Sequence, residues 1–167
     1  MSGSGMSGEA HVQDEGRELR LDLPAVHSAA RMARHLVREF SAREGLADEE
    51  VDSLLLIADE LLSNAVDHGG GEAAREEGDH SEAARMGLTL VLRDDGWVLE
   101  VSDEGGGDPD EVDALLHPAD LPDLEDERGR GFFLISGLVQ SLSVRRREDG
   151  LGLAITAVRL YGAREDA

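Results

Sequence analysis

The sequence predicts an α+β fold, a two-layer sandwich with helices packed on one face of a β-sheet. Two long segments carry apolar residues at helical spacing, and shorter alternating segments form pairs joined at Asp-Gly, the dipeptide favoured in tight hairpins. The expected order is strand, two helices, two strands, loop, helix and two strands. We expect one folded domain over residues 18–162, between a disordered arm at 1–17 and a short tail at 163–167.

The first strand and helix are predicted from periodicity. Glu18–Leu23 alternates polar and apolar residues, which predicts a strand that Pro24 ends. Val26–Glu44 places apolar residues on one helical face, and Gly45 stands where a helix would stop. Together they predict a strand followed directly by an amphipathic helix.

The second helix is expected to start after Leu46 and to run to His68. Its first turn is acidic, which suits the positive end of the helix dipole, and a run of glycines follows His68. Residues 69–85 are glycine-rich, acidic and aperiodic, so we expect a mobile surface insertion and assign it no function.

Two strands and a long loop are predicted next. Leu88–Arg93 and Trp97–Ser102 alternate and are joined at Asp95-Gly96, so we expect an antiparallel hairpin. The stretch between Ser102 and Gly129 is rich in Gly, Pro and Asp, with at most a short helix near Glu111–His117. Loops of that length inside a domain are usually functional or disordered.

The last elements are a helix and a second hairpin. GRGFFLISGLVQ, starting at Gly129, is predicted to be helical. SLSVRRRED and LGLAITAVRL then alternate around Asp149-Gly150, which predicts two antiparallel strands.

Composition excludes several classes of function. The formal net charge of −21 disfavours nucleic-acid binding, which draws most of its affinity from Lys and Arg on phosphates. The chain has no Cys, which excludes disulfides and thiolate chemistry, and no Lys, which excludes Walker A and protein-kinase phosphate sites. No apolar run approaches the roughly 20 residues that span a bilayer. We therefore expect a soluble, cytoplasmic protein that binds neither nucleic acid nor membrane.

The second predicted helix has a polar face that carries Glu60, Asn64, Asp67 and His68. On this evidence alone the face could be an ordinary solvated surface, and His68 could simply cap the end of the helix. Asn64, however, is the only asparagine in the chain, and it lies inside a helix where Asn has poor propensity. Its side-chain carbonyl is a hard oxygen donor of the kind that Mg²⁺ accepts.

Two glycine motifs follow the strands. Asp103, Gly105 and Gly107 come at a strand end, where a carboxylate can accept a hydrogen bond from an exocyclic amine and a flat ring can approach the backbone. A calcium loop is excluded, because Ala114 occupies the position of the bidentate Glu. Gly129-Arg130-Gly131 opens a helix, where free N–H groups, the dipole and the arginine form an anion site. No strand feeds directly into these glycines, so a Rossmann motif is excluded.

In this order and on these elements, the three segments resemble the N, G1 and G2 boxes of the histidine-kinase-like ATPase superfamily, which has the Bergerat fold. The combination is far more specific than any one motif. The resemblance runs from about Glu18 to Leu160 and is nearest to the stand-alone anti-sigma-factor serine kinases, whose N box has Glu where Glu60 stands. It implies a mixed, mostly antiparallel sheet.

The resemblance also implies a role for each site residue. Glu60 would be the general base and Asn64 the ligand of Mg²⁺, with His68 on the phosphate side. Asp103 would contact adenine, and Thr156 would stand behind the base. Gly105, Gly107, Gly129 and Gly131, with Arg130, would form the pocket and its lid. The implied cofactors are ATP and Mg²⁺.

The implied function is that of an ATP-binding anti-sigma-factor-like regulator, a serine/threonine protein kinase that phosphorylates an anti-anti-sigma (STAS-type) protein. A sigma factor would be the second partner, and a homodimer is compatible. Two features depart from the family pattern, namely the long 69–85 segment and an acidic lid between the glycine boxes.

Other functions remain open on the sequence. One is an ATP-binding regulator that holds a protein partner without transferring phosphate, and another is an interaction domain that has lost nucleotide binding. The catalytic module of a sensor kinase is disfavoured, because no phosphoacceptor dimerisation helix precedes Glu18.

Overall fold

A computed structural model describes residues 10–69, 84–105, 107–117, 125, 127–148, 150 and 152–162. The elements, in chain order, are β1 His11–Glu15, β2 Glu18–Pro24, α1 His27–Arg43, α2 Asp48–Gly69, β3 Arg85–Arg93, β4 Gly96–Asp103, α4 Pro109–Leu116, α5 Glu127–Ser136, β5 Ser141–Arg146 and β6 Leu153–Leu160. The predicted order of strands and helices from residue 18 onward is confirmed.

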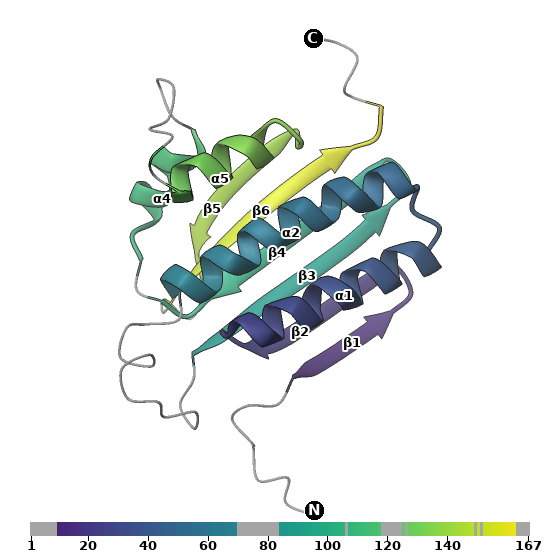
Figure 1. Cartoon of the computed structure of the whole chain (residues 1–167), viewed down its shortest axis with the longest axis horizontal. Helices are drawn as coiled ribbons and strands as arrows, with labels where there is room; N and C mark the ends of the chain where they lie inside the picture. The colour runs from purple at the N-terminus through teal and green to yellow at the C-terminus, as the bar shows by residue number, and fades with distance from the viewer. Residues whose placement is uncertain are drawn as a thin grey trace, which may run out of the picture.

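The strands form one six-stranded sheet in the order β1-β2-β3-β4-β6-β5. Each described pair of neighbours is antiparallel, so the expectation of a mixed sheet is wrong for the described strands. Two of the neighbouring pairs are joined by long connections: α1 and α2 lie between β2 and β3, and α4, α5 and β5 lie between β4 and β6. Figure 1 shows α1, α2 and α5 lying over this sheet.

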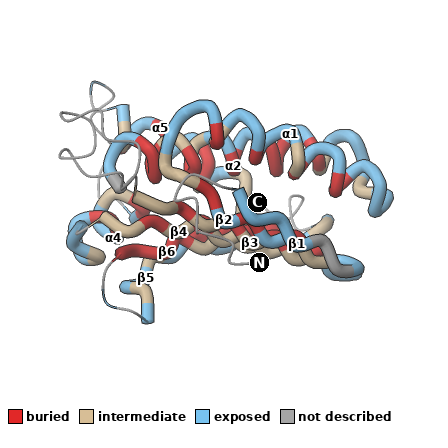
Figure 2. Tube along the Cα trace, turned by 90° about the horizontal axis from the view of Figure 1, so that it is seen from below, coloured by how far each residue is buried: buried red, intermediate tan, exposed pale blue. Residues whose placement is uncertain are grey.

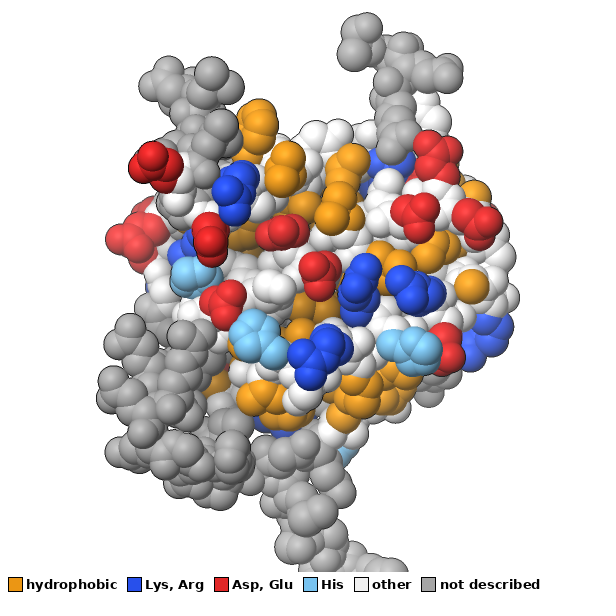
Figure 3. Space-filling view, viewed as in Figure 1, with side chains coloured by type: hydrophobic (Ala, Val, Ile, Leu, Met, Phe, Trp, Pro, Cys, Tyr) orange, Lys and Arg blue, Asp and Glu red, His pale blue; other side chains and the backbone are white. Residues whose placement is uncertain are grey.

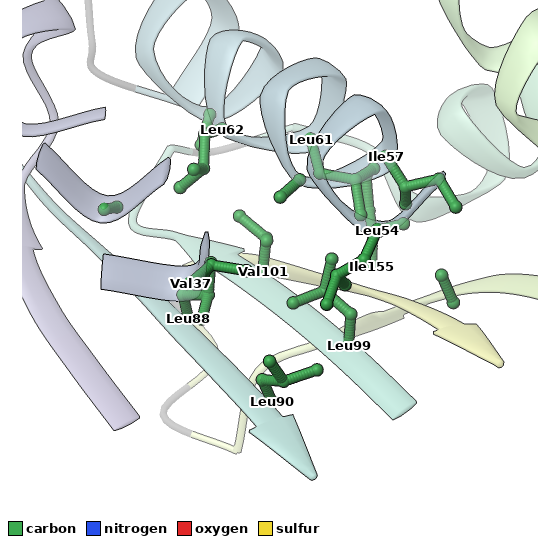
Figure 4. Close-up of a cluster of buried hydrophobic side chains, with 14 of the residues drawn as sticks. Val37, Leu54, Ile57, Leu61, Leu62, Leu88, Leu90, Leu99, Val101 and Ile155 are labelled. Carbon is green, nitrogen blue, oxygen red and sulfur yellow. The ribbon is translucent and has the colours of Figure 1, made fainter. Parts of the chain in front are cut away.

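The helices cover one face of the sheet, and the buried residues lie between the two layers (Figure 2). Figure 4 shows the centre of this core, where Leu54, Ile57 and Leu61 of α2 face Leu99 of β4 and Ile155 of β6. These side chains are at most 4% exposed. Burial of aliphatic surface is therefore what fixes α2 over β4 and β6, and it sets which face of α2 remains at the surface.

Strand β1 corrects the expectation of a disordered arm at 1–17. Residues His11–Glu15 pair with β2 through a two-residue turn at Gly16-Arg17, and Gly16 has φ 64°. A glycine with positive φ at the first position of such a turn is typical of a tight hairpin. The strand was missed because His11–Gln13 are all exposed, so no apolar alternation marks this edge strand. Residues 1–9 lie outside the described residues, as do 70–83 of the expected insertion and 163–167 of the expected tail.

The turn between β3 and β4 also differs from its prediction. Arg93 pairs with Gly96, so the turn residues are Asp94 and Asp95, not Asp95-Gly96. A Cβ on Gly96 would lie 2.0 Å from the backbone oxygen of Arg159 in β6. Gly96 is therefore needed for the close approach of two strands rather than for a turn conformation.

At the end of the sheet opposite Asp103, a buried ion pair ties β6 to the start of α2. Arg159 is 3% exposed, and its Nε and Nη2 donate to Glu50 at 2.6 and 3.0 Å. A further hydrogen bond runs from Arg159 to the carbonyl of Leu138. None of the helices in the described part of the chain is long and apolar enough to cross a membrane.

Candidate functional site

A cleft of about 240 Å³ lies between α2 and α5. Six of the residues singled out from the sequence line it, namely Glu60, Asn64, Asp67 and His68 of α2 and Arg130 and Gly131 of α5. The α2 residues and the α5 residues are separated by more than 60 positions in the chain. The packing of α2 and α5 on the same sheet face brings the two groups together. The polar face of α2 is thus one wall of a cleft, with Asp67 and His68 at its exposed end.

Asn64 is nearly buried, with 8% of its surface exposed. Its Oδ1 accepts a hydrogen bond from Nε of Arg128 at 2.8 Å. Arg128 lies in the first turn of α5 and was not singled out from the sequence. The only signal was a second arginine two residues before Arg130, and sequence does not reveal which of the two turns toward α2.

Glu60 lies against the backbone of α5. A Cβ added to Gly131 would be 2.3 Å from Oε2 of Glu60, so the absence of a side chain at Gly131 makes room for the carboxylate. The pKa of Glu60 is raised above its ordinary value by burial and then by the charge of Asp59, while the charge of Arg130 lowers it. A raised pKa makes this carboxylate a better proton acceptor than an exposed one.

Asp103 is the last residue of β4 and is 8% exposed. Its Oδ1 accepts a hydrogen bond from the amide of Gly105 at 2.9 Å, and its carboxylate also accepts one from the amide of Leu153. Burial raises the pKa of Asp103, whereas these two hydrogen bonds and the charges of Arg128 and Arg147 lower it. The carboxylate is thus held in place by backbone donors at the end of the strand.

The hairpin end of β5 and β6 supports Asp103 through residues that the sequence did not suggest. A Cβ on Gly152 would lie 1.7 Å from the backbone oxygen of Asp103, and Nη1 of Arg147 donates to the same oxygen at 3.2 Å. A Cβ on Gly107 would lie 3.1 Å from Cδ1 of Leu153. A side chain at position 107 would therefore have little space beside β6.

Thr156 is not part of this site, which corrects its predicted place behind the adenine. Side chains alternate between the faces of a strand, and Asp103 shares its face with the core residues Leu99 and Val101. Glu100 points to the other face, and Thr156 is its partner in the register and donates to its Oε2 at 3.2 Å. The residue of β6 beside Asp103 is Leu153.

The glycines of the third motif lie within α5 rather than at its start. The helix begins at Glu127, so Gly129 and Gly131 fall in its first two turns, where both are buried. Glu127 and Arg128 of its first turn line the cleft, so the positive end of the helix dipole lies beside it, as an anion site requires. Most of the loop before α5 lies outside the described residues, at 118–124 and 126.

The residues present fit a magnesium ion only in part. Among the residues that the structure describes, no three His, Asp or Glu side chains converge as a metal cage. Mg²⁺ commonly takes one or two protein oxygens and completes its shell with phosphates and water, so Asn64 alone has suitable chemistry. Its oxygen, however, already accepts the Arg128 hydrogen bond.

Comparison with known proteins agrees with this geometry. The sequence matches the histidine kinase-like ATPase domain family over residues 23–158, from the end of β2 through most of β6. The match covers most of the chain and includes α2, the end of β4 and α5. The chain therefore belongs to the histidine kinase-like ATPase domain family and has a Bergerat-type fold. A comparison with curated proteins gives no significant match.

Solved structures share the fold. A chain of the SiaB–SiaC complex from Pseudomonas aeruginosa is similar with a TM-score of 0.65 and 17% identity, over 86% of this chain and 90% of that one. The RsbU and RsbW domains of Rv1364c from Mycobacterium tuberculosis give a TM-score of 0.56 and 20% identity, over 86% of this chain and 32% of that one. Identities this low establish a common fold and leave function to the site.

Proposed function

We propose that the chain binds ATP in the α2–α5 cleft and acts as an anti-sigma-factor-like protein kinase that phosphorylates a serine or threonine of an anti-anti-sigma partner. The observation that carries this proposal is the meeting of Glu60 and Asn64 with Arg130 and Gly131 in one cleft. The family match and the buried Asp103 at the end of β4 support it.

Each group has a distinct task in this proposal. Asp103, fixed by the amides of Gly105 and Leu153, accepts the hydrogen bond of the adenine amine. Arg130 and the N-terminal turn of α5 bind phosphate oxygens. Asn64 would hold magnesium, which when bound neutralises phosphate charge. Phosphoryl transfer depends mainly on such positioning and charge, so few protein groups suffice.

Glu60 is the proposed proton acceptor. The hydroxyl oxygen of the partner forms a bond to the γ-phosphorus, the bond from that phosphorus to the β–γ bridging oxygen breaks, and ADP leaves. The hydroxyl proton passes to the Glu60 carboxylate. A well-placed general base contributes at least about 10²-fold to the rate.

The partner class rests on the structural neighbours and on charge. One neighbour was solved as a SiaB–SiaC complex and the other as the RsbU and RsbW domains of one protein, which supports a protein partner for this chain. Acidic and hydrophobic side chains lie side by side in the upper half of the helix-bearing face (Figure 3). With a net charge of −21, such a surface favours a partner with a basic docking face.

The test is transfer of labelled γ-phosphate to a candidate anti-anti-sigma protein. We expect Glu60→Gln to lower the transfer rate about 10²-fold or more while ATP affinity changes little. Asp52→Asn is the matched control, because it removes the same charge from an exposed position on the same helix. Equal rates for wild type and Glu60→Gln would overturn the role of Glu60.

One observation favours a second function, a regulator that binds ATP and a partner without transferring phosphate. Arg128 occupies the Asn64 oxygen that magnesium would use. A single-turnover assay separates the two functions: the kinase forms ADP and a phosphorylated partner, whereas the binder leaves ATP intact in a complex that survives gel filtration.

A further inference from the structure

Arg128 reaches across the cleft from α5 to α2. Its Nε donates to Oδ1 of Asn64 at 2.8 Å, and its guanidinium carbon lies 5.8 Å from the centre of the Phe132 ring. A cation over an aromatic face is attracted to the ring, and Phe132 is itself 2% exposed. Two contacts therefore hold the guanidinium against an amide oxygen that is nearly buried.

Asn64 Oδ1 is also the oxygen that the N box assigns to magnesium. Mg²⁺ binds its oxygen ligands at about 2.0–2.1 Å and demands near-ideal geometry. A guanidinium and a divalent ion on the same oxygen would lie only a few ångströms apart, and in a partly buried cleft their repulsion is weakly screened. One amide oxygen cannot serve both cations at full strength.

We infer that Arg128 and Mg²⁺ compete for Asn64 Oδ1, so that Arg128 sets how strongly the cleft prefers magnesium-ATP to metal-free ATP. The inference rests on the nucleotide binding proposed above. Arg128 is then a specificity-determining residue for the cation, and it does not take part in proton transfer. A chain with an uncharged residue at position 128 would have a stronger dependence on magnesium.

The charges around Arg128 are consistent with this role. The charge of Arg128 also acts on Asp103, so the guanidinium is within electrostatic range of both the predicted metal ligand and the predicted adenine contact. Glu60, Asp67 and Glu127 line the same cleft. Acidic walls favour bound positive charge, which the guanidinium and the metal can each supply.

The test compares nucleotide affinity with and without the metal. A fluorescent ATP analogue is titrated into the full chain in excess MgCl₂ and in EDTA, and the ratio of the two Kd values is the readout. We expect Arg128→Met to increase the preference for the magnesium form about tenfold, because a charge-assisted hydrogen bond no longer competes for Asn64. Arg128→Lys keeps the charge and is expected to hold the ratio near that of wild type.

The control is Arg34→Met, which removes the same charge from an exposed position on α1 and should leave the ratio unchanged. Circular dichroism verifies folding, and Arg128→Gln replaces the Met variant if that variant does not fold. If Arg128→Met leaves the ratio of the two Kd values unchanged, the competition is overturned while nucleotide binding still stands. This holds whether affinity weakens equally in both buffers or does not weaken in either. Absence of binding by wild type in both buffers would overturn the proposed function as well.

Discussion

The carboxylate of Glu60 on α2 occupies the space that a side chain at position 131 of α5 would fill. The distance from Oε2 to a Cβ built on Gly131 is 2.3 Å, far inside van der Waals contact. The atom in the way is the far end of a flexible side chain, so it can move without disturbing either helix. This pair therefore allows function and stability to be separated experimentally.

Gly131→Ala is expected to displace the Glu60 carboxylate and to lower phosphotransfer, while the free energy of unfolding stays the same or rises by up to about 1 kcal/mol because Ala favours a helix interior. Urea unfolding and the transfer assay measure the two effects. Gly137→Ala is the control, since its nearest neighbour is 3.7 Å away. Loss of several kcal/mol of stability in Gly131→Ala would show that Glu60 cannot move aside.

The Glu50–Arg159 pair should be important for stability. The side chain of Arg159 is 4% exposed and that of Glu50 is 18% exposed, so removing one partner leaves a charge buried. We expect Arg159→Met to cost about 3 kcal/mol in urea unfolding and the double variant with Glu50→Met to cost less. Asp94→Asn breaks the exposed pair with Arg17 and should cost under about 1 kcal/mol. A double variant that is less stable than Arg159→Met would contradict this account.

Asp103→Asn should make the free energy of unfolding less dependent on pH. The folded-state pKa of Asp103 is raised, mainly by burial, so the folded protein binds the proton more tightly than the unfolded chain does. Stability from this group is then fully present below the unfolded pKa and is lost as pH rises through the folded pKa. The stability of Asp103→Asn relative to wild type should increase between about pH 4 and pH 7, as measured by thermal unfolding. A constant difference would contradict the raised pKa.

The pH dependence of phosphotransfer should report Glu60. The reaction needs the carboxylate, and the pKa of Glu60 is raised by burial and by Asp59, so the rate should start to fall at a higher pH than an ordinary glutamate would give. Asp59→Asn removes a charge that raises this pKa and should shift the acid limb to lower pH. If Asp59→Asn does not shift the acid limb of the pH–rate profile, that limb belongs to a group other than Glu60.

Sequence reasoning predicted the helices and five of the six described strands because their burial imposes a period, as in Glu18–Leu23 and along α2. It missed β1, whose exposed side chains show no such period, and it placed Gly96 in a turn although its role is contact with β6. The sheet register decides such roles, and local sequence does not specify it.

The candidate site was also predicted from the sequence only in part. Glu60 and Asn64 could be found because their helical spacing fixes their common face, and Asp103 because it ends an alternating strand. Thr156 was placed wrongly because one residue along a strand reverses the face. Arg128 was missed because the rotation of α5 against α2 depends on packing across more than 60 positions of chain.

The central claim is that the α2–α5 cleft and Asp103 form an ATP site, and titration with a fluorescent ATP analogue in magnesium tests it most directly. The account predicts saturable binding that Asp103→Ala weakens about tenfold or more, since a buried hydrogen bond to the base is lost. Thr156→Val, on the opposite face of the sheet, should leave the Kd unchanged. Absence of saturation at millimolar nucleotide, or equal loss in both variants, would contradict the claim.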